Sequence, residues 1–188
     1  LALECVTLAP KETLPSYREI AAAYEEKGYA PSGQAVEYEA EQAGRKSGAA
    51  LYPDTDRASA ATSPADPSYT RLNVISSSEP GDWLEWTVNV PTDGLYQIGM
   101  RVMQDGNRGM VSTRRLYVDG KVPFAEAEYV EFPYAVGWYN YVLGGDTPWQ
   151  FYLTAGEHTL RLEVTTGRFA AALRTLQDMV EELNQLCR

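Results

Sequence analysis

The chain has 188 residues, of which 44% are hydrophobic and 22% charged. This length is enough for one domain with a hydrophobic core, and the composition excludes collagen-like, low-complexity and wholly disordered chains. Sixteen basic against 26 acidic side chains give a net charge of −10. That charge repels nucleic-acid phosphates and anionic lipids, so neither is an expected partner. No apolar run approaches the ~20 residues that cross a bilayer.

The first expected element is a helix over residues 14–28, which are rich in helix-forming residues. Thr13 is the expected N-cap, and Gly28 suits the end of the helix. Tyr17 and Tyr24 lie on one helical face, so we expect this helix to dock on the rest of the domain.

An acidic alternation follows in residues 35–43, with carboxylates at Glu37, Glu39 and Glu41. On a strand all three side chains project from one face. There they are either spread in solvent along an edge strand or gathered by a cation such as Ca²⁺, which takes oxygen ligands. The residues alone leave both interpretations open.

The middle of the chain predicts strands separated by turns. Residues 83–90 and 95–102 alternate around the turn sequence 91–94, which predicts an antiparallel hairpin. Asp119-Gly120 predicts a second, shorter hairpin, and residues 150–164 predict two more strands around a glycine turn. Short strands at this spacing, without intervening helices, indicate a β-sandwich.

The period changes after Gly167. An amphipathic helix is expected from about Arg168 to Cys187, because its apolar residues recur at steps of three and four. They are Phe169, Leu173, Leu176, Val180, Leu183 and Leu186. An exposed apolar stripe needs a partner, so we expect this helix to pack against the N-terminal helix beside the sandwich and to bring the termini close.

The cysteines and the single histidine support no enzyme class. Cys5 and Cys187 either form a disulfide or are two buried thiols, and their spacing excludes a paired-cysteine zinc site. His158 beside the Gly156 turn is typical of a half-exposed strand residue. No nucleophile elbow or phosphate-binding loop occurs, and nothing selects the carboxylate pair that a glycosidase needs. We therefore predict no catalysis.

Aromatic residues are concentrated in irregular segments. Residues 132–141 carry several rings beside Pro133 and Gly137, and Tyr52 and Tyr69 lie in a second irregular region. Rings on loops either form an exposed platform for the apolar face of a sugar or plug one end of the sandwich. The sequence leaves both roles open.

The stretch from about residue 35 to 166 resembles the carbohydrate-binding modules of families 6 and 35, which are jelly-roll sandwiches with a galactose-binding-like fold. The resemblance rests on the order and spacing of Tyr38-Glu39-Ala40-Glu41-Gln42-Ala43, Gly81-Asp82-Trp83-Leu84-Glu85-Trp86, Gly94-Leu95-Tyr96, Tyr117-Val118-Asp119-Gly120 and Phe151-Tyr152-Leu153-Thr154-Ala155-Gly156-Glu157-His158. It implies that Glu39 and Glu41 contribute to a structural calcium site and that Trp138 flanks the sugar.

The end of the chain departs from the family pattern. Those families close with an Asn and Asp pair in the last strand, whereas residues 164–168 run into the expected helix. We therefore expect a weak or empty calcium site. The flanking helices resemble an insert in large bacterial surface lipoproteins related to extracellular solute-binding proteins. That resemblance implies one module of a longer exported protein, extracellular and attached to the cell surface.

We thus expect a mainly β jelly-roll sandwich over residues 35–166, preceded by a strand and helix in 1–34 and followed by a helix in 167–188, all as one compact unit. The expected function is non-catalytic binding of an oligo- or polysaccharide. The alternative is a structural or protein-interaction domain without sugar affinity. The predicted sugar-binding residues are Trp138, Tyr139, Tyr52, Tyr69, Asp105, Asn107 and Arg108.

Overall fold

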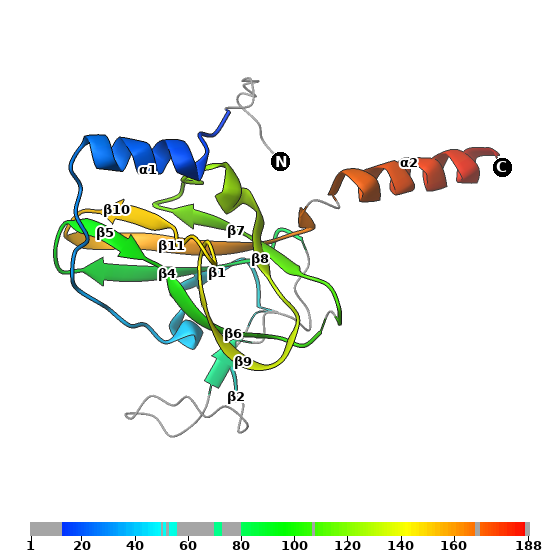
Figure 1. Ribbon diagram of the computed structural model, residues 1–188. Coiled ribbons are helices and arrows are strands. Elements are labelled where there is room, and N and C mark those ends of the chain that lie inside the picture. Colours follow the sequence, from blue (N-terminus) through cyan, green and yellow to red (C-terminus); the bar gives the residue numbers. More distant parts are fainter. Residues whose placement is uncertain are drawn as a thin grey trace, which may run out of the picture.

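The computed structural model describes residues 13–49, 51, 53–55, 70–72, 80–106, 108–167 and 170–186. They form two facing layers of antiparallel strands, with one helix against the sandwich and one extending from it (Figure 1). The mainly β sandwich predicted from the sequence is confirmed. Cys5 and Cys187 lie outside the described residues, so their pairing stays a prediction.

The first layer is a five-stranded sheet in the order β1–β4–β11–β7–β8. Its strands are β1 (Arg45–Lys46), β4 (Trp83–Val90), β11 (Gly156–Thr165), β7 (Ser112–Val118) and β8 (Val130–Phe132). Since β11 lies between β4 and β7, strands that are distant in the chain form the middle of this sheet.

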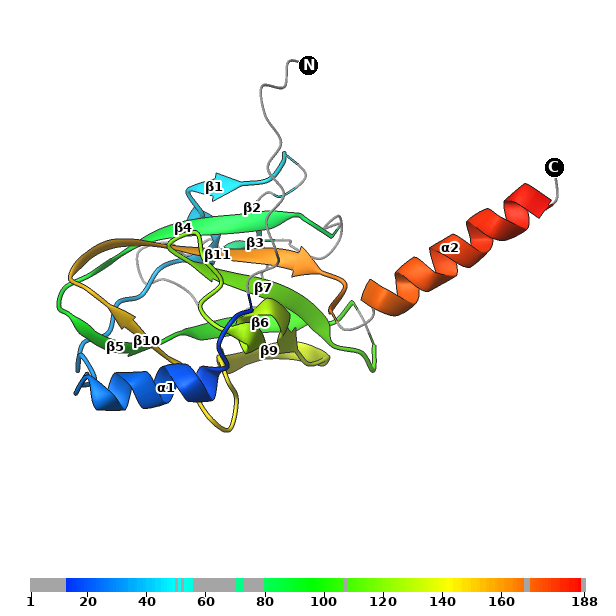
Figure 2. The same ribbon diagram turned by 90° about the horizontal axis from the view of Figure 1, so that it is seen from above.

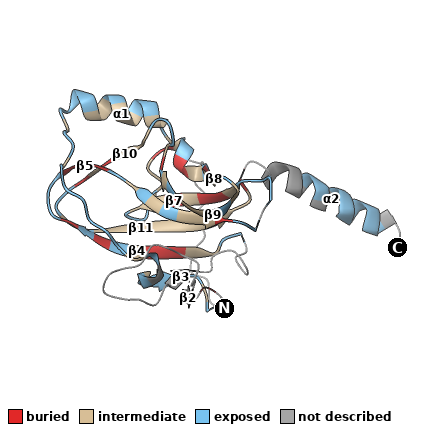
Figure 3. Cartoon of the chain, turned by 60° about the horizontal axis from the view of Figure 1, so that its bottom comes forward, coloured by how far each residue is buried: buried red, intermediate tan, exposed pale blue. Residues whose placement is uncertain are grey.

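The second layer consists of two strand pairs. β5 (Gly94–Gln97) pairs with β10 (Gln150–Leu153), and β6 (Gly99–Gln104) pairs with β9 (Ala135–Val142). A separate small pair joins β2 (Pro53–Thr55) to β3 (Thr70–Leu72). The core between the layers includes Leu116, Phe124 and Leu143, each 0% exposed, and buried residues are shown in red in Figure 3.

The hairpin predicted over residues 83–102 is wrong. β4 pairs with β1 and β11, whereas β5 pairs with β10 in the other layer. The turn at 91–93 therefore carries the chain across the sandwich, and the turn before Gly156 does the same between β10 and β11. Turn residues set a reversal of direction, but they do not decide whether the two strands share a sheet.

The turn at Asp119-Gly120 forms as predicted, because both residues have positive φ, 51° and 74°. Its second strand is shorter than expected. Only an isolated bridge joins Val118 to Lys121, and the next strand, β8, begins at Val130.

Helix α1 (Tyr17–Glu26) begins later than predicted, with Ser16 as its N-cap in place of Thr13. The Ser16 backbone N–H donates to Glu19 Oε2 at 2.7 Å, and the Glu19 N–H donates to Ser16 Oγ at 3.4 Å. This reciprocal capping box satisfies two free N–H groups at the helix start. The hydrogen bond from the Ser16 backbone, followed by that from its hydroxyl, lowers the pKa of Glu19.

Helix α1 docks on the second layer, as predicted. It lies above β10, next to the 3₁₀ helix η2 (Ala125–Tyr129) (Figures 1 and 2). The Tyr17 N–H donates to Glu126 Oε2 at 2.8 Å, and its ring centroid is 5.1 Å from that of Phe124. The Tyr17 hydroxyl also accepts from the Gln150 N–H at 2.9 Å. The apolar side of α1 is therefore already covered.

Helix α2 (Ala170–Leu186) does not pack on α1, which corrects the prediction. It extends away from the sandwich in both Figure 1 and Figure 2. Its residues Leu176, Met179, Val180 and Leu183 are more than half exposed, with values of 52–59%. The reason is that α1 has already used its apolar residues on Phe124 and β10. No described helix is long and apolar enough to span a membrane.

Candidate functional site

Three of the predicted sugar-binding residues lie in the β6–β9 strand pair or in the loop that follows β6. Gln104 at the end of β6 is in register with Ala135 at the start of β9, and a bulge follows between this pair and Val102 opposite Tyr139. Trp138 comes from the bulged stretch and is half-buried. Asp105 and Arg108, both exposed, come from the β6–β7 loop that starts beside Ala135. These residues form what we call the loop-end site.

One side-chain hydrogen bond joins the two ends of the β6–β7 loop, and a buried arginine lies at the start of β7. The Gln104 side chain is only 3% exposed, and its Nε2 donates to the Met110 carbonyl at 2.9 Å. On the other side, Arg114 Nη1 donates to Ser112 Oγ and to the Thr113 carbonyl, each at 2.8 Å. Burial lowers the pKa of Arg114 to about 10, still well above neutrality. The Gln104 hydrogen bond therefore restrains the loop, and Arg114 is bonded within β7 itself.

Tyr139 has a different environment from Trp138. The Tyr139 hydroxyl donates to the Pro133 carbonyl at 3.1 Å, and its ring lies 6.4 Å from that of Tyr141. Burial, with a smaller contribution from Tyr141, raises the pKa of Tyr139. Tyr139 thus holds the turn that leads into β9.

The remaining predicted sugar-binding residues, Tyr52, Tyr69 and Asn107, lie outside the described residues and stay predictions. Glu39 precedes the 3₁₀ helix η1 (Ala40–Gln42) as its N-cap residue. The acidic alternation was expected to lie on a strand. It does not, because the chain turns into a 3₁₀ helix at Ala40. Within the described part of the chain, no three carboxylate, imidazole or thiol side chains gather to hold a metal ion. The side chain of Glu41 lies outside the described residues, so a calcium site at Glu39 and Glu41 stays a prediction.

The outer face of the five-stranded sheet carries a charged and aromatic array that the sequence analysis missed. Its centre is Glu85 on β4, only 4% exposed. Glu85 Oε1 accepts from Arg45 Nη1 at 3.0 Å, and Oε2 lies 2.7 Å from Arg161 Nη2 and 2.9 Å from its Nε. The Arg161 guanidinium lies 4.1 Å from the centroid of the Trp83 ring, a cation–π contact. This array fixes one carboxylate and one aromatic ring in place.

A second row of the array lies on the neighbouring strands. The Tyr117 hydroxyl donates to Glu163 Oε2 at 2.7 Å, and Arg115 Nη1 lies 3.5 Å from Glu163 Oε1. Burial and, after it, the Glu163 carboxylate raise the pKa of Tyr117, although Arg115 opposes this. Hydroxyls, guanidinium groups and rings held in this way suit the recognition of a polar ligand with an apolar face. The register of β4, β11 and β7 creates the array.

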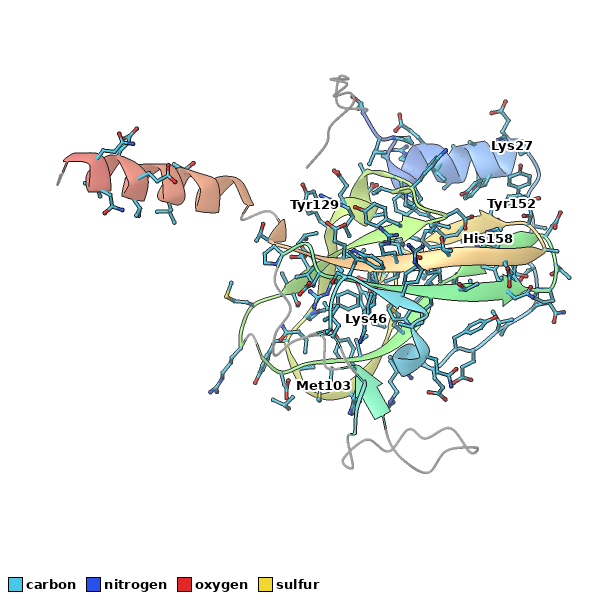
Figure 4. The ribbon with its side chains drawn as sticks, turned by 180° about the vertical axis from the view of Figure 1, so that it is seen from behind. Lys27, Lys46, Met103, Tyr129, Tyr152 and His158 are labelled. Carbon is cyan, nitrogen blue, oxygen red and sulfur yellow. The ribbon has the colours of Figure 1, made fainter. Side chains whose placement is uncertain are left out.

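His158 on β11 is a structural residue with both ring nitrogens engaged (Figure 4). Nδ1 lies 2.7 Å from Asp119 Oδ2, and Nε2 lies 2.8 Å from the Thr154 carbonyl oxygen. Burial of the ring lowers its pKa, but the hydrogen bonds to Asp119 and Thr154 outweigh this, so the pKa of His158 is raised overall. The imidazole ring ties the Asp119-Gly120 turn to β11.

We expect the free energy of unfolding to fall as the pH rises from 6 to 9. A raised folded-state pKa gives stability that is fully present below the unfolded value of about 6.5 and is lost as the pH passes the folded value. Urea unfolding at several pH values measures the effect, with His158→Asn as the control. Because the chain has one histidine, the variant should lack this fall. An equal fall in both proteins would contradict the prediction.

The chain was compared with known protein families and solved structures. The family model described as carbohydrate binding module (family 6) matches residues 39–176. No curated protein matches the sequence. A Paenibacillus sp. cycloisomaltooligosaccharide glucanotransferase, complexed with cycloisomaltoheptaose, is similar to the chain with a TM-score of 0.50 and 21% identity. The match covers 80% of this chain but only 21% of the glucanotransferase, so this chain spans about a fifth of that enzyme.

Two further solved structures are similar at lower scores. A family 35 carbohydrate binding module from Clostridium thermocellum has a TM-score of 0.46 and 18% identity, covering 62% of this chain and 78% of the module. The Podospora anserina GH26-CBM35 β-(1,4)-mannanase has a TM-score of 0.45 and 19% identity, covering 69% of this chain and 24% of the mannanase.

Proposed function

The chain belongs to family 6 of the carbohydrate binding modules, and from this premise we propose that it binds an oligo- or polysaccharide without catalysing a reaction. The observation that carries the proposal is the family match over residues 39–176, which includes both layers of the sandwich. Family membership supports carbohydrate as the class of ligand. Fold and family do not by themselves show a working site, so the site is argued from its residues.

We place the sugar at the loop-end site. The half-buried Trp138 ring offers an apolar face for the C–H groups of a sugar ring, and the exposed Asp105 and Arg108 offer an acceptor and donors for its hydroxyls. The restrained β6–β7 loop reduces the entropy lost on binding, because Gln104 already joins its two ends. A shallow, exposed site of this kind gives dissociation constants on the order of 10⁻³ to 10⁻⁵ M.

We also propose that the module acts in a larger exported protein, extracellular and attached to the cell surface. A polymeric sugar outside the cell is a ligand that a module without catalysis can use to hold a protein in place. The comparison with a glucanotransferase about four times as long supports a modular context, because the shared fold occupies only 21% of that chain. Cell fractionation of the source organism with an antibody to this domain tests the location.

A glycan array followed by titration calorimetry tests the function. The array should include cycloisomaltoheptaose and β-1,4-mannan, the carbohydrates of two structurally similar proteins. Trp138→Ala is expected to weaken binding at least about tenfold, since a stacked aromatic ring is a typical hot spot. Val136→Ala, at an exposed position of the same strand, should keep a normal melting temperature and controls for unfolding.

The outcomes separate the function from the site. If no glycan binds, the chain is a structural or protein-interaction domain and the proposed function is wrong. If Trp83→Leu abolishes binding while Trp138→Ala does not, the function stands but the sugar lies on the outer face of the five-stranded sheet, over the Glu85 array.

A further inference from the structure

Three aspartates of the chain are followed directly by glycine. The pairs are Asp93-Gly94, Asp105-Gly106 and Asp119-Gly120. A glycine has no side chain to shield its backbone nitrogen, so that nitrogen can reach the carboxyl carbon of the preceding aspartate. All three pairs share this local chemistry. Their different surroundings in the fold therefore decide which of them can react.

The first pair, Asp93-Gly94, lies where the chain crosses between the two layers of the sandwich. Asp93 Oδ1 accepts from the Ala155 N–H at 2.7 Å, which ties the aspartate to the turn before β11. Gly94 is buried and in register with Leu153 of β10. A Cβ added at Gly94 would lie 2.7 Å from the Ser32 Cα, so the backbone there has no room to rearrange.

The pair Asp119-Gly120 is held by its own carboxylate. Asp119 Oδ1 accepts from the Thr159 N–H at 2.9 Å, and Oδ2 lies 2.7 Å from His158 Nδ1. The Asp119 N–H in turn donates to the Thr159 carbonyl at 2.9 Å. The two carboxylate oxygens would have to give up these partners before the carboxyl carbon could turn toward the Gly120 nitrogen.

The pair Asp105-Gly106 lies in the β6–β7 loop. The β6–β9 pairing ends with Gln104 opposite Ala135, so both residues of the pair lie beyond it. Both are exposed, and no described residue donates a hydrogen bond to the Asp105 carboxylate. This carboxylate can therefore turn toward the next nitrogen without breaking any hydrogen bond that the structure describes. An exposed loop also has the freedom that the change of backbone shape requires.

We propose that Asp105 is a site of spontaneous isomerisation to isoaspartate, and that the fold protects Asp93 and Asp119 from the same reaction. The Gly106 backbone nitrogen attacks Asp105 Cγ and forms a new C–N bond. The carboxyl group loses its OH and the nitrogen loses its hydrogen, so one water leaves and a succinimide ring remains.

Water opens the succinimide ring in either of two ways. Addition at Cγ breaks the new C–N bond and restores aspartate. Addition at the main-chain carbonyl carbon of Asp105 breaks the original peptide C–N bond and leaves isoaspartate, in which the chain continues through the former side chain. The water released in the first step is returned in the second, so the overall reaction is an isomerisation that consumes no oxidant or other reactant.

Isoaspartate changes the loop-end site. It adds one carbon to the main chain inside the segment that the hydrogen bond from Gln104 Nε2 to the Met110 carbonyl closes. It also moves the carboxylate from the end of a side chain to the former main-chain carbon. The consequence for binding rests on the proposed function: the acceptor that Asp105 offers to a sugar hydroxyl is displaced, so the isomerised chain binds sugar more weakly.

Storage of the whole 188-residue chain followed by peptide mapping tests the proposal. The chain is kept for weeks in heavy-oxygen water, either folded or in urea. Mildly acidic buffer is used, because the OH group leaves from the protonated acid. Each opened ring then carries a heavy oxygen. Trypsin in ordinary water places the three pairs in separate peptides, 72–101, 102–108 and 116–121, because each is bounded by arginine or lysine. Chromatography separates the isoaspartate forms.

In urea the three peptides should gain label at rates within about threefold of one another, because no fold distinguishes them. In the folded chain, peptide 102–108 should stay within about threefold of its rate in urea, whereas the other two should slow at least tenfold, because their rings need local unfolding. If folding slowed 102–108 as much as the other two, or if either of those gained label faster than 102–108, the proposal would be overturned.

A glycine variant locates the reaction. Gly106→Ala should slow the labelling of 102–108 at least about fivefold, because the added Cβ hinders the nitrogen, and should leave the other two peptides unchanged. Unchanged labelling of 102–108 in this variant would contradict attack by the Gly106 nitrogen. Calorimetry with a glycan that binds the fresh chain measures the loss of affinity separately. If no glycan binds the fresh chain, the proposed function fails, whereas the labelling rates still decide the isomerisation.

Discussion

Replacing Phe124 with alanine is expected to lower the free energy of unfolding by about 3–5 kcal/mol. The ring is 0% exposed, and its centroid lies 5.1 Å from that of Tyr17, 5.0 Å from Trp149 and 5.7 Å from Phe151. Removing it leaves a cavity where α1, η2 and β10 meet, and the three surrounding rings lose their common neighbour. Urea unfolding followed by near-UV circular dichroism measures the loss, which should lower the melting temperature by about 10 °C.

Two control variants set the scale for the loss of stability in Phe124→Ala. Phe124→Leu keeps most of the apolar volume and should cost less than half as much. Tyr129→Ala removes an aromatic ring from the same 3₁₀ helix, but that ring is 37% exposed, so its loss should cost about 1 kcal/mol. A cost below about 1.5 kcal/mol for Phe124→Ala would mean that the helix α1 is not part of the cooperative core.

The sequence predicted the elements better than their partners. The strand pattern over residues 83–90 coincides with β4. Alternation and turn residues act locally, so they show where strands begin and end. The hairpin prediction failed because the same pattern fits a strand pair within one sheet and a crossing between two sheets. Which of these occurs depends on β11, whose residues lie far along the chain between β4 and β7.

The candidate site residues were also predictable only where the local sequence was sufficient. Trp138, Asp105 and Arg108 could be predicted because aromatic and polar residues on loops suggest recognition without any knowledge of pairing. The array around Glu85 could not, because its hydrogen bond to Arg161 Nε joins residues 76 positions apart. Its only sequence signal was that Trp83 and Glu85 occupy the polar phase of the β4 alternation. The exposed face of α2 could not be predicted, because the sequence of α1 does not show that Phe124 and β10 already cover its apolar residues.

The Glu85 array makes the two faces of β4 different from each other. Glu85 and Trp86 are consecutive on β4, so they point to opposite faces of the five-stranded sheet. On the outer face the side chain of Glu85 is nearly completely buried by its ion pairs, whereas on the core face Trp86 remains half-buried. Ion pairs therefore cover the outer face of β4, whereas apolar packing buries Leu84, Val88 and Val90 on its core face.

Replacing Glu85 with alanine is expected to lower the free energy of unfolding by about 2–3 kcal/mol, near the lower end for a broken buried ion pair. The carboxylate is buried, but the Arg161 side chain is 26% exposed, so water partly replaces the lost partner. Arg45→Ala serves as the matched control. Its side chain is 71% exposed, so removing it should cost less than about 0.5 kcal/mol.

A double-mutant cycle of Glu85→Ala with Arg161→Ala, measured by urea unfolding, isolates the pair. We expect a coupling of about 1–2 kcal/mol, because Arg161 contacts Glu85 through both Nη2 and Nε and its guanidinium is held over Trp83. Salt at 1 M should reduce the coupling only slightly, since the Glu85 side chain is 5% exposed and screening acts mainly on exposed charges. A coupling near zero, or one that disappears in salt, would show that Glu85 behaves as a surface residue and that the array does not fix the outer face of the sheet.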